Sequence, residues 1–213
     1  MSRTSQTNSN RVPSPIRYYV SFSGEKGTFS YWDSANKERV DLGSEVEFVV
    51  MDTRSAITGW NDAANARIFS NRVKSVAKEE LTVRCDKQVL ATGMYSAIKG
   101  DIANAGGKFC TEVFALMKIN GEFAPVQLDL SGASLGCWMA FVEGLGGSWA
   151  IYKDLITTKL GEQKKKGRVT FFEVAFGTAP LSEDANELAN AFNDDKLQPY
   201  LNNSTATQEA AVV

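Results

Sequence analysis

The chain of 213 residues contains no histidine. A Ser-His-Asp or Cys-His mechanism and a His-ligated zinc site are therefore excluded. Its three cysteines, Cys85, Cys110 and Cys137, are scattered and form no C-x-x-C pair. We therefore expect a reduced chain in which the cysteines serve as small apolar residues, with no metal and no cofactor.

Long apolar runs are also missing from the sequence. No stretch of 18 apolar residues occurs, so no membrane-spanning helix is predicted. The polar N-terminus does not show the charged and then apolar pattern of a secretory signal. We expect a cytoplasmic protein that makes no membrane contact.

The net charge of −2 is unevenly distributed along the chain. Residues 181–213 hold six acidic residues and a single basic residue, Lys196, whereas residues 1–180 hold 22 basic and 19 acidic residues. A mildly basic body with an acidic end is compatible with nucleic-acid binding, although many inert domains share this balance.

The stretch 107–145 is the organising unit of the chain. Residues 108–118 and 123–130 have the alternation of strands, and Asn120-Gly121 between them is the strongest short hairpin signal. Apolar residues then recur at helical spacing, which predicts a helix packed on these strands. These residues are Leu135, Trp138, Met139, Val142 and Leu145.

Short strands and turns surround this unit. Strands are predicted at residues 17–23, 28–32, 36–42, 45–52, 66–69, 81–85, 89–92, 149–160 and 168–176. Further helices are predicted at residues 95–105 and from Ser182 to Phe192. Residues 53–65 are interpreted as a long connection and residues 161–167 as a charged loop.

This pattern predicts a mainly β fold with helices (α+β). We expect an OB-like antiparallel β-barrel with two to three helices and flexible termini, and a different β-sandwich is the alternative. Residues 1–15 are predicted to be a disordered N-terminal segment and residues 16–180 the OB-like nucleic-acid-binding domain. Residues 181–213 are predicted to be an acidic C-terminal helix followed by a flexible tail.

Aromatic residues interleaved with basic residues suggest a binding surface. Unpaired bases stack on aromatic rings while cations follow the phosphates, as single-stranded nucleic acid requires. The candidate rings are Tyr31, Trp32, Trp60 and Phe69. The candidate cations are Arg67, Arg72, Lys74, Lys99, Lys108, Lys164, Lys165, Lys166 and Arg168.

The segment from Leu90 to Phe141 resembles a family of phage-encoded single-stranded-DNA-binding proteins. The resemblance covers about the middle half of the chain. Three blocks carry it: Ala91, Gly93, Tyr95, Ile98 and Lys99, then Ala105, Gly106, Gly107 and Lys108, and finally Leu130, Gly132, Ala133 and Trp138. It implies an OB-like fold and sequence-independent binding of single strands. We accordingly expect a non-enzymatic single-stranded-DNA-binding protein that acts in phage DNA replication or recombination in the host cytoplasm.

Partners other than DNA follow from the same reasoning. The acidic C-terminal region is expected either to compete for the DNA groove or to contact replication or recombination proteins. A homo-oligomer is compatible with the chain, because one small barrel covers few nucleotides. Two alternatives stay open: a protein-interaction or virion structural component without nucleic-acid binding, and a Mg-dependent nuclease using acids such as Glu45, Glu47 or Asp52.

Overall fold

The structure of the chain, a computed structural model, describes residues 12–209. The strands are β1 (Tyr18–Ser23), β2 (Thr28–Asp33), β3 (Glu38–Gly43), β4 (Glu47–Asn61), β5 (Ala66–Ser70), β6 (Leu81–Cys85), β7 (Gln88–Gly93), β8 (Gly107–Ile119), β9 (Glu122–Ser131), β10 (Leu155–Lys166) and β11 (Val169–Ala179). The helices are α1 (Tyr95–Asn104), α2 (Gly132–Gly144), the 3₁₀ helix η2 (Ala150–Tyr152), α3 (Glu183–Phe192), the π-helical turn η3 (Asn193–Leu197) and α4 (Gln198–Glu209).

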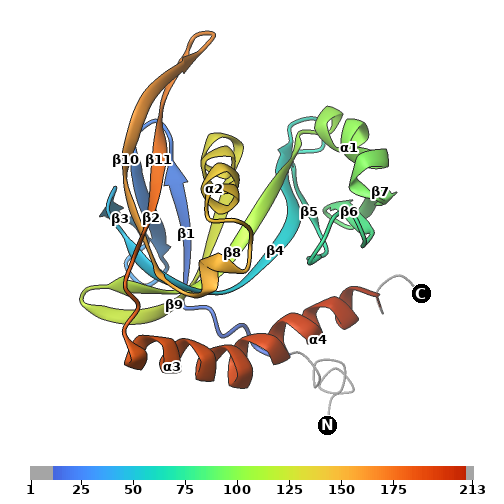
Figure 1. The fold of residues 1–213 in the computed structure, drawn as a ribbon. Coiled ribbons are helices and arrows are strands. Elements are labelled where there is room, and N and C mark those ends of the chain that lie inside the picture. The colour runs from blue at the N-terminus through green and yellow to red at the C-terminus, as the bar shows by residue number, and fades with distance from the viewer. Residues whose placement is uncertain (1–11, 210–213) are drawn as a thin grey trace.

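All eleven strands of the described residues belong to one open, mixed sheet (Figure 1). Its main path runs β3-β2-β1-β9-β8-β4-β5-β6-β7, and β10 joins β4 off this path while pairing with β11. β1 is antiparallel to β2 but parallel to β9. The mainly β, α+β prediction is therefore confirmed, but the sheet does not close into an antiparallel barrel.

The two faces of the sheet carry different helices (Figure 1). On β8, Val113 and Met117 point to the side covered by α2, where Leu135 and Trp138 join the same buried cluster. Phe114, one residue further along β8, points to the opposite side and packs with the C-terminal helices. We call these sides the α2 face and the α4 face.

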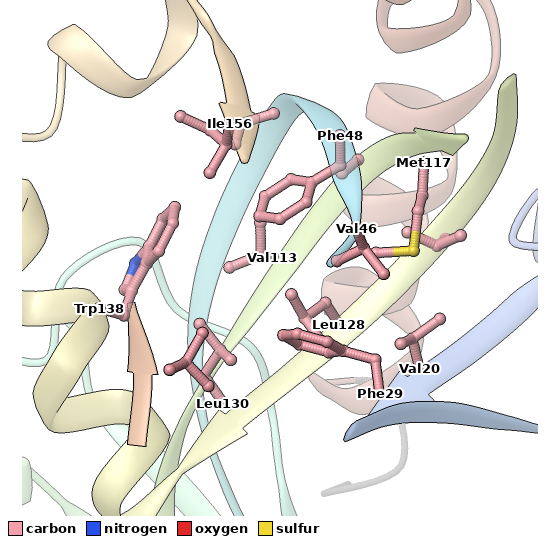
Figure 2. Packing of buried hydrophobic residues seen from close by; sticks show 14 of the residues in the cluster. Val20, Phe29, Val46, Phe48, Val113, Met117, Leu128, Leu130, Trp138 and Ile156 are labelled. Carbon is pink, nitrogen blue, oxygen red and sulfur yellow. The ribbon is translucent and has the colours of Figure 1, made fainter. Parts of the chain in front are cut away.

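The largest buried cluster lies under α2 (Figure 2). Phe48, Val113 and Leu128 come from three strands and are fully buried there, and the Trp138 ring of α2 lies tilted against Phe48 at 6.4 Å between ring centroids. Burial of such side chains contributes about 1.5–3 kcal/mol each. This cluster fixes α2 against β8, β9 and β11.

The C-terminal helices pack on the α4 face. Leu197 and Leu201 are almost completely buried with Phe114 and Leu116 of β8. Ser182 caps α3 by accepting a hydrogen bond from the Ala185 N–H at 3.3 Å, as the sequence predicted. The sequence did not predict α4, which continues to Glu209 in the region expected to be a tail.

Three local predictions were wrong. The expected connection 53–65 is mostly strand, because β4 extends to Asn61 through a run of consecutive polar residues from Asp52 to Ser55. The expected strand 149–160 begins with the helix η2, and β10 starts only at Leu155. The expected loop 161–167 is the outer part of β10, so that only Gly167 and Arg168 form the turn.

Two predictions on the termini lie partly outside the described residues. Residues 12–17 have no regular secondary structure, whereas the rest of the predicted N-terminal segment and residues 210–213 are not described. Among the described helices, none combines the length and the apolar character that crossing a membrane requires.

Candidate nucleic-acid interface

Four predicted residues meet on one open part of the α4 face, at the end of the sheet formed by β8, β4, β5 and β6. Strand pairing sets Thr58 of β4 opposite both Lys108 and Phe69. One position further out, Trp60 is the direct partner of Arg67. Since alternate residues of a strand point to the same side, Trp60, Arg67, Phe69 and Lys108 share this face.

A fifth residue, Arg84, completes the group, because β6 pairs it with Phe69. We call the five residues the platform: Trp60, Arg67, Phe69, Arg84 and Lys108. The opposite side of the same strands is sealed, since Ile57, Ile68 and Val83 are buried with Ile98 and Ile102 of α1. The platform is therefore the free face of a locally rigid sheet.

The rings and cations of the platform are accessible. Trp60 is 49% exposed, Arg67 and Lys108 are exposed, and Phe69 and Arg84 are half-buried. None of the ion pairs between described residues involves a platform cation. A half-exposed tryptophan beside cations that form no ion pair is the combination that stacks unpaired bases and contacts their phosphates.

Two glycines hold Trp60 in place. Gly106 has φ of +95°, and a Cβ atom there would collide with the Trp60 carbonyl oxygen. A Cβ at Gly59 would collide with the Gly106 carbonyl oxygen in the same way. The end of β4 therefore lies directly against the turn between α1 and β8. This gives a structural reason for the Gly106-Gly107-Lys108 block.

Arg72 lies on the same face but is occupied by other protein groups. Its guanidinium pairs with the Glu112 carboxylate, donates to Gln127 Oε1 at 3.0 Å and to the Tyr200 hydroxyl at 3.1 Å. Burial alone lowers the pKa of Arg72, but Glu112 and Tyr200 outweigh it and raise the pKa. The Arg72 side chain therefore links the sheet to α4 through an ion pair and hydrogen bonds, and it is poorly available to contact a phosphate.

Two acidic residues, Glu112 and Asp129, lie beside Arg72 at the border of the platform. Burial raises the pKa of Glu112, and Arg72 opposes the rise. Burial also raises the pKa of Asp129, against the hydrogen bond that Gln127 Nε2 donates to it at 2.8 Å. Negative charge here disfavours a phosphate path across the middle of the α4 face.

Tyr31 is buried and cannot take part in a binding surface. It is only 6% exposed and packs in the α2-face core against Tyr18, with ring centroids 4.4 Å apart. The reason is strand alternation: Tyr31 pairs with Val20, so both point to the core, and the neighbouring Trp32 points outward. The prediction of Tyr31 as a stacking ring is therefore corrected.

Trp32 lies on the α4 face but at the other end of the sheet, where Arg39 is its direct partner on β3. Tyr19 is exposed on the adjacent strand β1. The Arg39 guanidinium is held by Ser30 Oγ at 3.0 Å. Trp32, Arg39 and Tyr19 form a second exposed group, separated by β9 from β8, the nearest strand of the platform.

The remaining predicted cations lie elsewhere. Lys74 is exposed in the loop between β5 and β6, where its own N–H donates to Glu79 Oε1. Lys99 is exposed on α1, the helix that covers the α2 face behind the platform. Lys164, Lys165, Lys166 and Arg168 lie at the outer end of β10 and β11. The structure therefore contains no single continuous track through all predicted residues.

Sequence reasoning missed several exposed residues. Arg84 was detectable, because it alternates with the apolar Val83 and Cys85 in a short strand. Tyr19 and Arg39 required knowledge of which strand face meets the core. Trp149 is 58% exposed beside η2, with Lys153 Nζ 4.2 Å from its ring centroid, and no sequence signal marked it as exposed.

The acids of the nuclease alternative do not converge. The Asp52 carboxylate accepts hydrogen bonds from Arg54 at 2.8 Å and Gln198 at 2.7 Å, and Glu47 pairs with Lys118. Across the part of the chain that the structure describes, no group of three Cys, Asp or Glu side chains is arranged to hold a metal ion.

Comparisons with protein-family models, curated proteins and solved structures find no match to this chain. The geometry of the platform is therefore the basis for a functional proposal.

Proposed function

We propose that this protein binds single-stranded DNA without sequence preference, and that the platform is the contact surface. The observation that supports this is the pairing of half-exposed Trp60 with Arg67 on an open sheet face, next to Phe69, Arg84 and Lys108. Each base stacked on such a ring contributes about 1–3 kcal/mol, and every base can stack. The phosphates then lie within reach of three unpaired cations.

The family resemblance adds the biological setting to this proposal. It assigns the protein to phage DNA replication or recombination in the host cytoplasm, as a non-enzymatic binder. The OB-like architecture is part of that resemblance, whereas the platform needs only an open sheet face. Exposed acids of α3 and η3, including Asp184 and Asp195, are the surface for contacts with replication or recombination proteins. Homo-oligomerisation would extend the binding site along the strand.

The experiment is a titration of a labelled oligo-dT, followed by anisotropy, at several salt concentrations. The wild type should bind with a log–log salt slope of about −0.7 per phosphate neutralised. Trp60→Ala should weaken binding about 5- to 150-fold through loss of stacking. Trp149→Ala is the matched control, because Trp149 is similarly exposed but lies outside the platform.

Two results would count against the proposal. If the anisotropy of oligo-dT does not change with the wild type at low salt, the protein does not bind single strands. If Trp60→Ala and Trp149→Ala lose oligo-dT affinity equally, the protein binds single strands but the platform is not the binding site.

A protein-interaction component is the second candidate function, supported by Trp32, Arg39 and Tyr19. Tryptophan, arginine and tyrosine are the residues most enriched at protein-interface hot spots. Asp33 and Glu38 lie on the same hairpin and offset the positive charge of Arg39. On this view Trp32→Ala leaves oligo-dT affinity unchanged and weakens a protein contact instead.

A further inference from the structure

The hairpin of β10 and β11 projects from the sheet as a two-stranded ribbon (Figure 1). β10 pairs with β4 only at Ile156 and Thr157, and beyond these residues its strand partner is β11. Every residue from 162 to 170 is exposed. An isolated two-stranded hairpin is at best marginally stable in water, so the outer ribbon adds little to the fold and is available for binding.

The base of the ribbon is anchored. The Phe172 N–H donates to the Gly24 carbonyl oxygen at 2.7 Å, and this ties β11 to the turn between β1 and β2. A bulge follows between Leu160 and Gln163. A Cβ atom at Gly161 would lie 2.7 Å from the Glu173 carbonyl oxygen, so the bulge requires glycine there. Bulges bend and twist a strand, and this one directs the outer ribbon away from the sheet.

The outer ribbon is cationic on both of its sides. Lys164 and Lys166 alternate with Lys165, so their side chains leave opposite faces of the ribbon. Lys164 is partly neutralised by Glu162 at 2.6 Å, with Glu173 at 3.9 Å. Lys165, Lys166 and Arg168 take part in none of the ion pairs between described residues.

The ribbon differs from the platform in one decisive respect: its exposed residues, 162–170, include no aromatic ring, and Phe171 and Phe172 at its base, which pair with Lys164 and Gln163, are half-buried. Cations without rings contact phosphates but cannot stack unpaired bases. The fitting ligand therefore has its bases already paired. A protein partner fits less well, because lysine is depleted at protein interfaces.

We propose that the β10–β11 ribbon binds duplex DNA, so that one molecule holds a duplex through the ribbon and an adjoining single strand through the platform. A two-stranded ribbon fits the B-DNA major groove, which is about 12 Å wide. The five residues from Glu162 to Lys166 span roughly 17 Å, enough to enter a groove about 8.5 Å deep. The single-strand half of this inference rests on the proposed function.

The two surfaces belong to opposite sides of the molecule. The ribbon continues from the part of β11 that packs against α2 through Val174 and Phe176. The platform lies on the α4 face. A short single strand therefore does not contact both surfaces, whereas a duplex with a single-stranded tail passes from one side of the sheet to the other. The preferred ligand is accordingly a tailed duplex.

The experiment compares the affinity of the full chain for three labelled ligands: oligo-dT, a blunt duplex, and the same duplex with an oligo-dT tail. The ribbon variant is Lys165→Gln/Lys166→Gln/Arg168→Gln, in which all three residues are exposed. The control variant, Lys37→Gln/Lys78→Gln/Lys196→Gln, removes the same charge at exposed sites outside the ribbon and the platform.

The ribbon variant should lose about tenfold or more of the tailed-duplex and blunt-duplex affinity at low salt, with a salt slope shallower by up to about 0.9 per lost contact. Its oligo-dT affinity should change less than threefold, as should all affinities of the control. Equal losses for oligo-dT and duplex, or duplex affinity unchanged by the ribbon variant, would overturn the inference. If the protein does not bind oligo-dT but binds duplex through the ribbon, the proposed function is wrong while the duplex-binding role of the ribbon stands.

Discussion

Glu112 on β8 and Asp129 on β9 are direct cross-strand partners on the α4 face. Both carboxyl groups are largely buried, and burial raises the pKa of each. Glu112 forms an ion pair with the Arg72 guanidinium. Asp129 instead accepts a hydrogen bond from the neutral Gln127 side chain. Two like charges opposite each other in a sheet are destabilising, so this pair lowers the stability of the fold at neutral pH.

Asp129→Asn should therefore stabilise the protein at pH 7 by roughly 0.5–1 kcal/mol. A carboxyl group whose pKa is raised by folding contributes stability below its unfolded pKa of about 4 and loses this contribution as the pH rises through the folded pKa. The gain from Asp129→Asn should thus shrink towards zero below about pH 4. Denaturant unfolding from acid to neutral pH measures this difference. A gain that is equally large in acid would contradict the assignment.

Arg72→Met tests whether Arg72 is a structural tie or a DNA contact. Removing the guanidinium leaves the Glu112 carboxylate buried without its partner, which costs about 3–5 kcal/mol. Arg72→Met/Glu112→Gln should recover a large part of this loss in denaturant unfolding. The double variant should also keep the wild-type salt slope for oligo-dT. A slope shallower by about 0.7 would instead identify Arg72 as a phosphate contact.

Gly106→Ala should impair stability and binding together. The new Cβ collides with the Trp60 carbonyl oxygen at a positive φ, so we expect a loss of about 1–3 kcal/mol and a displaced Trp60. Unfolding and oligo-dT anisotropy should both report the change. Gly100→Ala on α1 is the matched control, because a Cβ there meets no atom within 4 Å. It should stabilise the helix by about 0.5–1 kcal/mol and leave binding unchanged.

Leu197→Ala tests whether the acidic C-terminal region is part of the folded body. Leu197 is fully buried with Phe114 and Leu116, so its truncation should cost about 2–5 kcal/mol. Leu188→Ala changes the same residue type on α3, but that side chain is 48% exposed and the cost should stay below about 1 kcal/mol. Equal, small effects in thermal unfolding would show that the C-terminal helices are not needed for the fold.

Local signals in the sequence predicted the centre of the fold well. Asn120 and Gly121 both have positive φ, as the predicted tight hairpin requires, and they join β8 to β9. Leu135 and Trp138 of the predicted helical stripe are buried as expected, whereas Met139 of the same stripe is 59% exposed. These features depend on neighbours in sequence, so sequence patterns identify them directly.

Features set by distant contacts were not predictable in the same way. The outer half of β4 was missed, because the four consecutive polar residues from Asp52 to Ser55 conceal the strand pattern, although Arg54, Ala56 and Ile57 are buried in the fold. Tyr31 and Trp32 were interchangeable in the sequence, and only the pairing of β1 with β9 decides which ring meets the core. The platform was predicted in four of its five residues, while its separation from the ribbon depends on the sheet order.

The parallel pairing of β1 with β9 also constrains the order of folding. Tyr18 to Ser21 lie beside residues Val126 to Asp129, so this contact closes a loop of more than 100 residues. During synthesis the hairpin of β1 and β2 leaves the ribosome well before its parallel neighbour exists. The edge of β1 that pairs with β9, where Val20 is buried in the folded protein, stays exposed until β9 has been synthesised. The first hairpin made therefore cannot join the sheet until β9 has been synthesised, and this slow, long-range step leaves its edge exposed to aggregation in the meantime.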